Sequence, residues 1–205
     1  SCAVVQPGEP LMPITRPDVT ILPWQGKHPR IHDSAFIAPG CRIIGDVEIG
    51  PDASIWYNCV IRADVNRVVI GARTNIQDGT VIHCDSPQPN EPDGHPALIG
   101  DDVLVGHMAM LHGCTIENRA FVGLGSIVMN DCVIEGDAML AAGAMLTSGK
   151  RVPSGQLWGG RPAAYMRDLS GSPGSWSIPH YVGLAKSHMA EIAAAMGAAD
   201  GPAEG

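Results

Sequence analysis

Aliphatic residues recur at every sixth position over most of the chain, with small or polar residues between them. The repeat has nineteen members: Ile31, Ile37, Ile43, Ile49, Ile55, Ile61, Ile70, Ile76, Ile82, Ile99, Val105, Leu111, Ile116, Val122, Val128, Ile134, Leu140, Leu146 and Val152. A six-residue period is typical of a parallel β-helix, in which three units complete one coil and the aliphatic side chains fill the interior. The pattern therefore predicts an all-β solenoid rather than a β-sandwich with chance periodicity.

Three changes of spacing locate the places where the chain departs from regular coils. The interval after Ile61 is nine residues instead of six, and we expect the three extra residues to bulge out as a short loop. The interval after Ile82 is seventeen, which predicts a long loop over residues 86–96. The interval after Leu111 is five, which predicts a tightened corner.

The repeat divides the chain into three segments. Residues 1–30 form an N-terminal arm or cap, residues 31–160 form the β-helix with its inserted loop 86–96, and residues 161–205 hold a connector, a helix and a mobile tail. The stretch VTILPW predicts a strand or an extended arm across the first coil, because an uncapped β-helix exposes strand edges. At the other end, VPSGQLWGGRPAAYMRDLS predicts an exit turn.

The stretch SIPHYVGLAKSHMAEIAAAMG predicts one α-helix packed along the outside of the solenoid. Ser177 can cap this helix, Pro179 suits its first turn and Gly197 can end it. An apolar face appears at helical spacing. Its members are Tyr181, Leu184, Ala185, His188 and Ile192.

Composition and charge exclude several classes of function. The 205 residues and the net charge of −8 fit one domain, and no basic stripe points to a nucleic-acid partner. No apolar run approaches the ~20 residues of a membrane span. Six cysteines without a CxxC pair, and a start unlike a signal peptide, predict a reduced, cytoplasmic protein. The mitochondrial matrix is the alternative if the source is eukaryotic.

Two histidines occupy equivalent positions in successive coils. His83 directly follows one aliphatic anchor, and His112 follows the anchor three units later. The two imidazoles should therefore stack on one outer face, roughly 4.8 Å apart, with Arg62 one rung below. Two imidazoles at this separation can share a zinc ion, because zinc binds histidine nitrogens at about 2.0–2.1 Å.

His107 stands two places after its anchor, near another corner, and should not reach that ion within one chain. A threefold trimer would bring another side of a neighbouring chain against the histidine pair. We therefore expect an interfacial metal site, with ligands from two chains of a homotrimer. The remaining histidines lack partners in the pattern and are expected to be solvated: His28, His32, His95, His180 and His188.

The repeat, RADVNRVVIGARTNIQDGTVIH, GDDVLVGHMAMLHGC and WGGRPAAYMRDL together resemble the γ-class carbonic anhydrases from Ile31 to the C-terminal helix. The resemblance implies a left-handed β-helix with a C-terminal helix, assembled as a trimer with metal ions at subunit interfaces. It implies His83, His107 and His112 as metal ligands. It also implies reversible hydration of carbon dioxide to bicarbonate by metal-bound hydroxide, with Zn²⁺, or Fe²⁺ or Co²⁺, as the metal.

The same resemblance assigns roles around the metal. Arg62 and Asp64 match the family's RxD pair, which supports the interface and the metal-bound solvent; a plain interface ion pair is the alternative. Asn75 and Gln77 match its NxQDG segment, in which the glutamine hydrogen-bonds the hydroxide. Tyr181 resembles an aromatic residue that many relatives direct toward the site.

One feature of the archetype is missing. Its proton-shuttle glutamate directly follows the RxD pair, where this chain has Val65. The loop at 86–96 offers Glu91, Asp93 and His95 instead, and His95 is the candidate shuttle.

Two other classes of function stay open. Hexapeptide solenoids also serve as acyl-CoA acyltransferases and thioesterases, but the long loop has no Lys or Arg for the coenzyme phosphates. Other relatives are non-catalytic scaffold subunits of respiratory complex I. The presence of all three histidines favours metal binding over a pure scaffold.

Overall fold

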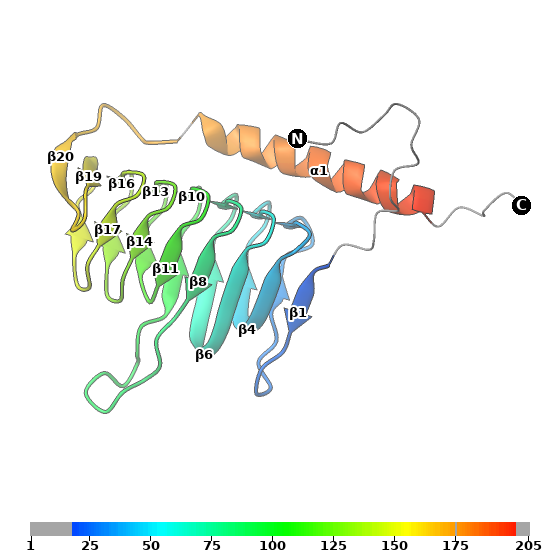
Figure 1. Cartoon of the computed structure of the whole chain (residues 1–205), viewed down its shortest axis with the longest axis horizontal. Helices are drawn as coiled ribbons and strands as arrows, with labels where there is room; N and C mark the ends of the chain where they lie inside the picture. The colour runs from blue at the N-terminus through cyan, green and yellow to red at the C-terminus, as the bar shows by residue number, and fades with distance from the viewer. Residues whose placement is uncertain (1–17, 175, 200–205) are drawn as a thin grey trace, which may run out of the picture.

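The computed structural model describes residues 18–174 and 176–199, which form a parallel β-helix of about eight coils with a helix beside it (Figure 1). The predicted left-handed hexapeptide fold is confirmed. The predictions for residues 1–17, among them Cys2, and for the tail beyond residue 199 lie outside this range.

The solenoid has three faces. The helix face consists of two-residue rungs and a final hairpin: β3 (Phe36–Ile37), β5 (Ser54–Ile55), β7 (Asn75–Ile76), β10 (Leu104–Val105), β13 (Phe121–Val122), β16 (Met139–Leu140), β19 (Gln156–Gly159) and β20 (Ala164–Asp168).

The other two faces form one continuous sheet. The histidine face contains the first parts of β4 (Arg42–Ile49) and β6 (Val60–Ile70) together with β1 (Thr20–Leu22), β8 (Val81–His83), β11 (Met110–His112), β14 (Ile127–Val128) and β17 (Met145–Leu146). The third face contains the last parts of β4 and β6 together with β2 (Arg30–Ile31), β9 (Ala97–Ile99), β12 (Thr115–Ile116), β15 (Val133–Ile134) and β18 (Arg151–Val152).

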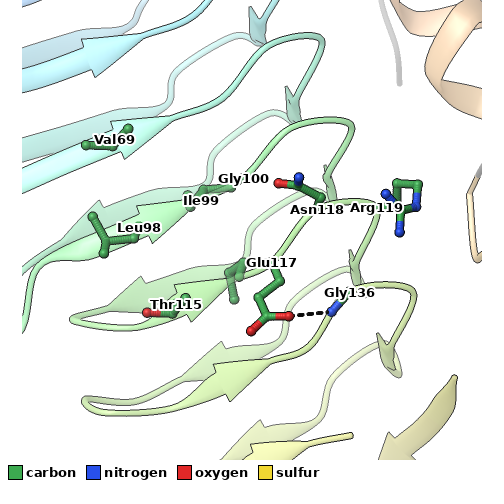
Figure 2. A pocket seen from close by; sticks show the side chains of 10 residues that line it. Val69, Leu98, Ile99, Gly100, Thr115, Glu117, Asn118, Arg119 and Gly136 are labelled. Atoms are coloured by element: carbon green, nitrogen blue, oxygen red, sulfur yellow. Dashed lines mark hydrogen bonds between the residues drawn. The ribbon is translucent and has the colours of Figure 1, made fainter. Parts of the chain in front are cut away.

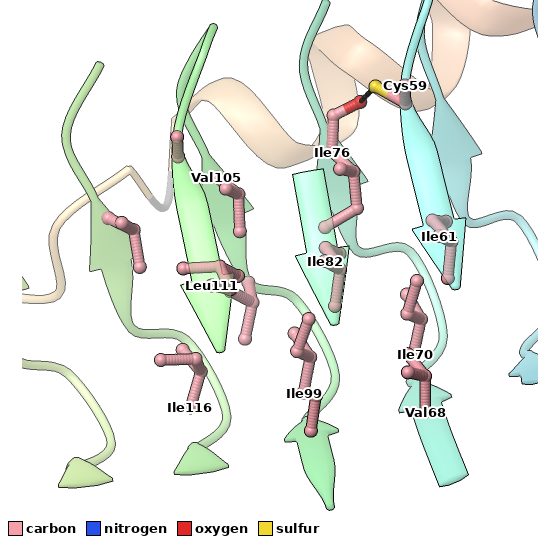
Figure 3. Packing of buried hydrophobic residues seen from close by; sticks show 14 of the residues in the cluster. Cys59, Ile61, Val68, Ile70, Ile76, Ile82, Ile99, Val105, Leu111 and Ile116 are labelled. Carbon is pink, nitrogen blue, oxygen red and sulfur yellow. Dashed lines mark hydrogen bonds between the residues drawn. The ribbon is translucent and has the colours of Figure 1, made fainter. Parts of the chain in front are cut away.

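The six-residue anchors stack in the interior, as predicted (Figure 3). Ile61, Ile82 and Leu111 pair in register from coil to coil and are fully buried. Burying one such side chain stabilises the fold by about 1.5–3 kcal/mol. Because every coil repeats the one before, the exposed residue after each anchor is also stacked in a column.

The cysteines at the corners are small buried fillers. Cys59 donates a hydrogen bond from Sγ to the carbonyl of Gln77 at 3.1 Å. Burial raises the pKa of Cys84, and it raises the pKa of Cys114 to about 12. All five cysteines in the described part of the chain are free and buried, as expected for thiols that act as apolar fillers.

The three extra residues after Ile61 do bulge, as predicted, but they lie within a strand and do not form a separate loop. Strand β6 runs unbroken to Ile70, and the three extra residues appear as a shift of register against β4 between Gly45 and Val47. The first part of β6 pairs with β8 and the last part pairs with β9. Strand β6 therefore turns the corner between the histidine face and the third face as one strand, as β4 also does, but with three more residues at the corner.

The other two spacing predictions are confirmed. The long loop leaves between β8 and β9 and projects on the side away from the helix (Figure 1). The tightened corner lies at Gly113, whose φ of 53° is in the left-handed region. A Cβ atom there would lie 2.7 Å from Cβ of His95, so glycine lets the end of the loop pack against this corner.

Both ends of the solenoid are covered by extra strands. Strand β1 pairs in parallel with β4, which confirms the strand predicted in VTILPW. At the other end the predicted exit turn is wrong, because β19 completes a rung and β20 folds back antiparallel to it. Pairing with β20 satisfies an edge that would otherwise be exposed.

Helix α1 (Ser177–Ala199) lies along the helix face (Figure 1), as predicted. Ala185 is buried, and Tyr181, Leu184 and Ile192 pack against the core. His188 was expected to be solvated but is half-buried, and its Nδ1 lies 2.8 Å from the hydroxyl of Tyr57. In the described residues, no helix has the length and hydropathy needed to cross a bilayer.

The predicted helix ends were wrong in detail. The hydroxyl of Ser177 donates to the carbonyl of Gly174 at 2.7 Å and so holds the preceding turn instead of accepting from the helix. The helix continues two residues beyond Gly197 to Ala199. Glycine is only a weak stop signal when no left-handed turn follows it.

Candidate metal centre

His83 and His112 lie side by side on the histidine face. The two residues pair across β8 and β11, and Nδ1 of His83 is 3.0 Å from Nε2 of His112. Arg62 pairs with His83 from β6. The predicted column of Arg62, His83 and His112 is therefore confirmed.

Asp64 determines which nitrogen of His83 carries the proton. Its Oδ1 is 2.9 Å from Nε2 of His83, and its Oδ2 accepts from Arg62 at 2.5 Å. Burial alone would raise the pKa of Asp64, but the hydrogen bonds from His83 and Arg62 outweigh burial and lower it. An ionised carboxylate only accepts hydrogen bonds. Nε2 of His83 must therefore be protonated, and in the neutral imidazole this leaves a lone pair on Nδ1.

Asn130 does the same for His112 from the next coil. Its Oδ1 contacts Nδ1 of His112, and its Nδ2 donates to Asp85 at 2.6 Å. Nδ1 of His112 is consequently the protonated nitrogen, and Nε2 carries the lone pair. The periodic count does place residue 130 one coil above Gly113, but nothing in the sequence assigned a role to Asn130 or Asp85.

The two nitrogens that face each other therefore both present lone pairs. Two lone pairs at 3.0 Å repel each other unless a proton or a metal ion lies between them. A tetrahedral zinc ion with bonds of 2.0–2.1 Å holds its ligand nitrogens about 3.3 Å apart, close to the observed separation. The donor set and the second hydrogen bond of each ring fit a zinc-type metal ion.

His107 lies in the corner between β10 and β11, before the strand that ends at His112. Its Nδ1 is 2.8 Å from Oδ2 of Asp78, and its side chain is 46% exposed. This leaves Nε2 directed away from Asp78. Asp78 was not identified from the sequence. The six-residue repeat could have found it, because Asp78 and His107 both stand two places after an anchor in successive coils.

One chain does not assemble three ligands. In the described part of the chain, no group of three or more His, Cys, Asp or Glu residues is close enough to hold a metal ion. The chain offers a pair of imidazoles at one corner and a single imidazole at another. This separation matches the prediction that His107 cannot join His83 and His112 within one chain.

The other predicted site residues lie on the His107 side. Gln77 is 4% exposed and directly precedes Asp78. Asn75 is fully buried, donates to Ser54 at 2.9 Å, and has no partner for its Oδ1. Tyr181 packs edge-on against Trp56, which occupies the position of Gln77 one coil earlier.

The base of the long loop packs against the corner that follows His112. Nε2 of His95 is 2.9 Å from a carboxylate oxygen of Glu91, so His95 has a partner that the sequence pattern did not reveal. His95 also packs on Gly113, the residue after His112. The loop therefore places the backbone and Cβ of His95 at the corner that follows His112.

A separate groove of about 520 Å³ lies on the third face, away from the histidine pair (Figure 2). Its lining residues are Val69, Leu98, Ile99, Gly100, Thr115, Ile116, Glu117, Asn118, Arg119 and Gly136. Arg119 is the one cation in this lining, all of which is described, and both its Nε and an NH₂ group donate to Asp137. The groove offers no free cation to a phosphate.

Known proteins share this pattern. Residues 28–63 match the family described as bacterial transferase hexapeptide (six repeats). A carbonic anhydrase of Geobacillus kaustophilus is 50% identical over 73% of this chain and 79% of its own length. Gamma carbonic anhydrase 1, mitochondrial, of Arabidopsis thaliana is 42% identical over 82% of this chain. The chain spans 62% of the length of that plant protein.

Solved structures agree on the architecture. A hexapeptide transferase family protein of Anaplasma phagocytophilum is 44% identical, with a TM-score of 0.69, over 87% of this chain and 97% of its own. Because 44% of the residues are identical over nearly the whole of that protein, the two chains are similar in sequence as well as in fold.

Proposed function

The chain belongs to the γ-class carbonic anhydrase family, and we propose that it is a metal-dependent carbonic anhydrase that interconverts carbon dioxide and bicarbonate. The observation that carries this proposal is that Nδ1 of His83 and Nε2 of His112 face each other at 3.0 Å, with the lone pair of each nitrogen directed at the other. Two neutral rings in these tautomers repel each other at this distance, and either a bridging proton or a metal ion that accepts both lone pairs removes the repulsion. The metal ion is the one we propose.

We assign the third ligand to His107 of a neighbouring chain in a homotrimer. Exposed apolar side chains surround His107 and β11, and such a patch marks a contact surface. They are Met108, Leu124, Met110 and Met129, with exposures of 74%, 49%, 38% and 37%. Gln77, Asn75 and Tyr181 would enter the site with His107, because they lie on its side of the chain.

When bound, a Zn²⁺, Fe²⁺ or Co²⁺ ion held by three neutral imidazoles lowers the pKa of water to about 7 and so supplies hydroxide at neutral pH. Asp64 keeps His83 in the ligating tautomer, and Arg62 holds Asp64. Gln77 carries the amide that would orient the attacking oxygen by a hydrogen bond.

The proton released by hydration needs a route to buffer. His95 and Glu91 form a hydrogen-bonded pair at 2.9 Å on the loop whose base packs against the corner that follows His112. Glu91 is 49% exposed, so the pair reaches solvent. We assign His95 the role of proton acceptor, in place of the glutamate that is absent at Val65.

The acyltransferase alternative lacks support from the surface. Coenzyme phosphates need free cations, and the groove on the third face has only the paired Arg119. A measurement of carbon dioxide hydration distinguishes a non-catalytic scaffold from a carbonic anhydrase. The plant relative is named mitochondrial, so cytoplasmic and matrix localisation both stay predictions.

The test combines metal analysis with stopped-flow hydration of carbon dioxide on the purified oligomer, prepared with zinc or anaerobically with iron. We expect about one metal ion per chain and hydration that disappears in His107→Ala. Full metal occupancy without hydration would point to a scaffold or another substrate. A wild-type protein that binds no metal would overturn the proposal.

A further inference from the structure

An amide holds His112, whereas carboxylates hold His83 and His107. An amide can turn either its oxygen or its NH₂ group toward an imidazole, so Asn130 alone does not decide the tautomer of His112. Asp85 removes this ambiguity. Because its carboxylate only accepts, the NH₂ group of Asn130 must face it at 2.6 Å, and Oδ1 must then face His112.

Asp85 is itself fixed by the base of the long loop. Its other carboxylate oxygen accepts from the backbone N–H of Ser86 at 2.9 Å. Its backbone exchanges two hydrogen bonds with His95, at 2.8 and 3.2 Å. The side chain of Asn66 on β6 donates to the carbonyls of Asp85 and Asp93 at 2.9 and 2.8 Å. The carboxylate therefore cannot turn away from Asn130 without opening the loop.

We propose that Asp85 and Asn130 are positioning residues that keep the proton of His112 on Nδ1 and so hold Nε2 ready for the metal. Each group in this series donates a hydrogen bond to the next one: the imidazole of His112 donates to the amide of Asn130, and that amide donates to the carboxylate of Asp85. This inference rests on the proposed metal site, and it also makes the metal-ligand tautomer depend on an intact loop base.

The Asp85→Asn variant gives a definite prediction. The new amide would accept from Ser86 through its oxygen and turn its NH₂ group toward Asn130. Asn130 would then rotate and present its own NH₂ group to His112, which moves the imidazole proton to Nε2. Nitrogen-15 NMR of labelled histidine in the metal-free oligomer reads this tautomer directly. Zinc affinity, measured against a competing chelator, should fall about 10–100-fold.

The double variant Asp85→Asn with Asn130→Asp should restore both properties. The new carboxylate at position 130 would accept from Nδ1 of His112 and from the new amide at position 85. Net charge equals that of the wild type. Asp131→Asn is the matched control, since it removes one charge beside Asn130, and the hydrogen bonds of His112 and Asp85 go to Asn130 and not to the side chain of Asp131.

Three results would overturn the proposal: an unchanged His112 tautomer in Asp85→Asn, an unchanged zinc affinity in that variant, or no recovery in the double variant. His83 is an internal control, because Asp64 holds it and its tautomer should not move. A wild-type chain that binds no zinc would defeat the proposed function, whereas the NMR measurement on metal-free protein would still decide the roles of Asp85 and Asn130.

Discussion

Nδ1 of His83 and Nε2 of His112 lie 3.0 Å apart on adjacent strands, and the hydrogen bonds on the far side of each ring leave both nitrogens unprotonated. Half of the proposed metal site is thus preformed in one chain. The other half, His107, lies in the corner between β10 and β11 and is held by Asp78.

Mixing subunits tests whether the site is shared. We expect that His83→Ala and His107→Ala each abolish tight zinc binding. Trimers formed by unfolding and refolding an equal mixture should regain about a quarter of the sites, because some interfaces then combine an intact pair with an intact His107. The measurement is zinc per chain. A mixture of His83→Ala and His112→Ala should regain none, since both changes damage the same half-site, and recovery there would contradict the shared geometry.

Substitutions of Asp64 and Arg62 should affect different properties, zinc affinity in the first case and trimer association in the second. Asp64→Asn replaces the carboxylate by an amide that can face His83 either way, so we expect zinc affinity to fall about 10–100-fold. Arg62→Ala leaves Oδ1 of Asp64 on His83 and should change zinc affinity far less. Its effect should appear instead in the trimer association constant, measured by analytical ultracentrifugation. Equal losses of zinc affinity in both variants would show that Arg62 acts on the metal site and not only at the interface.

The hydroxyl of Tyr57 ties helix α1 to the solenoid through His188. Removing it in Tyr57→Phe should lower the free energy of unfolding by about 1 kcal/mol, because a half-buried hydrogen bond is lost while the ring packing stays. Urea unfolding measures the difference. Tyr165→Phe is the control, since Tyr165 is exposed and lies outside this contact, and its unfolding free energy should not change.

Arg119 donates twice to Asp137 and holds the pKa of that carboxyl below its usual range. A lowered folded-state pKa stabilises the fold above the unfolded-state pKa, and this contribution disappears as pH falls through the folded-state value. Asp137→Asn should therefore be slightly less stable than wild type at pH 7, and the two should converge below about pH 4. Thermal unfolding of both proteins at both pH values measures the difference in stability. A difference that persists in acid would show that ionisation of Asp137 beside Arg119 is not its cause.

The buried thiols should be inert in the folded protein. In a Cys2→Ser background, a thiol reagent at pH 8 should label none of the five described cysteines, since they are buried and burial raises the pKa of Cys84, Cys114 and Cys132. All five should react in denaturant. Rapid labelling of the native protein would mean that the coils open far more often than their packing suggests.

Periodicity predicts whatever depends on backbone register alone. Each coil copies the previous one, so the six-residue count correctly placed His83 beside His112, with Arg62 below them, and separated His107 from both. The apolar face of α1 follows from the same kind of counting. Deviations in the period also located the long loop and the tight corner at Gly113.

The six-residue period does not determine whether extra residues form a loop or lengthen a strand. Three extra residues after Ile61 could leave as a loop or lengthen a strand, and the choice depended on neighbours on both sides: β8 pairs with one part of β6 and β9 with the other. The same holds for the hairpin of β19 and β20, where antiparallel pairing outweighed the local turn signals.

The amino-acid sequence by itself therefore determined the solenoid, its interior and the positions of the three histidines, because these follow from spacing. Only the tertiary structure decided which nitrogen of each histidine is free. That choice depends on side-chain hydrogen bonds from Asp64, Asp78 and Asn130, and for Asn130 on a carboxylate 45 positions away at Asp85. Such contacts depend on rotamers and on the closure of a non-repeating loop, and no periodic count contains either.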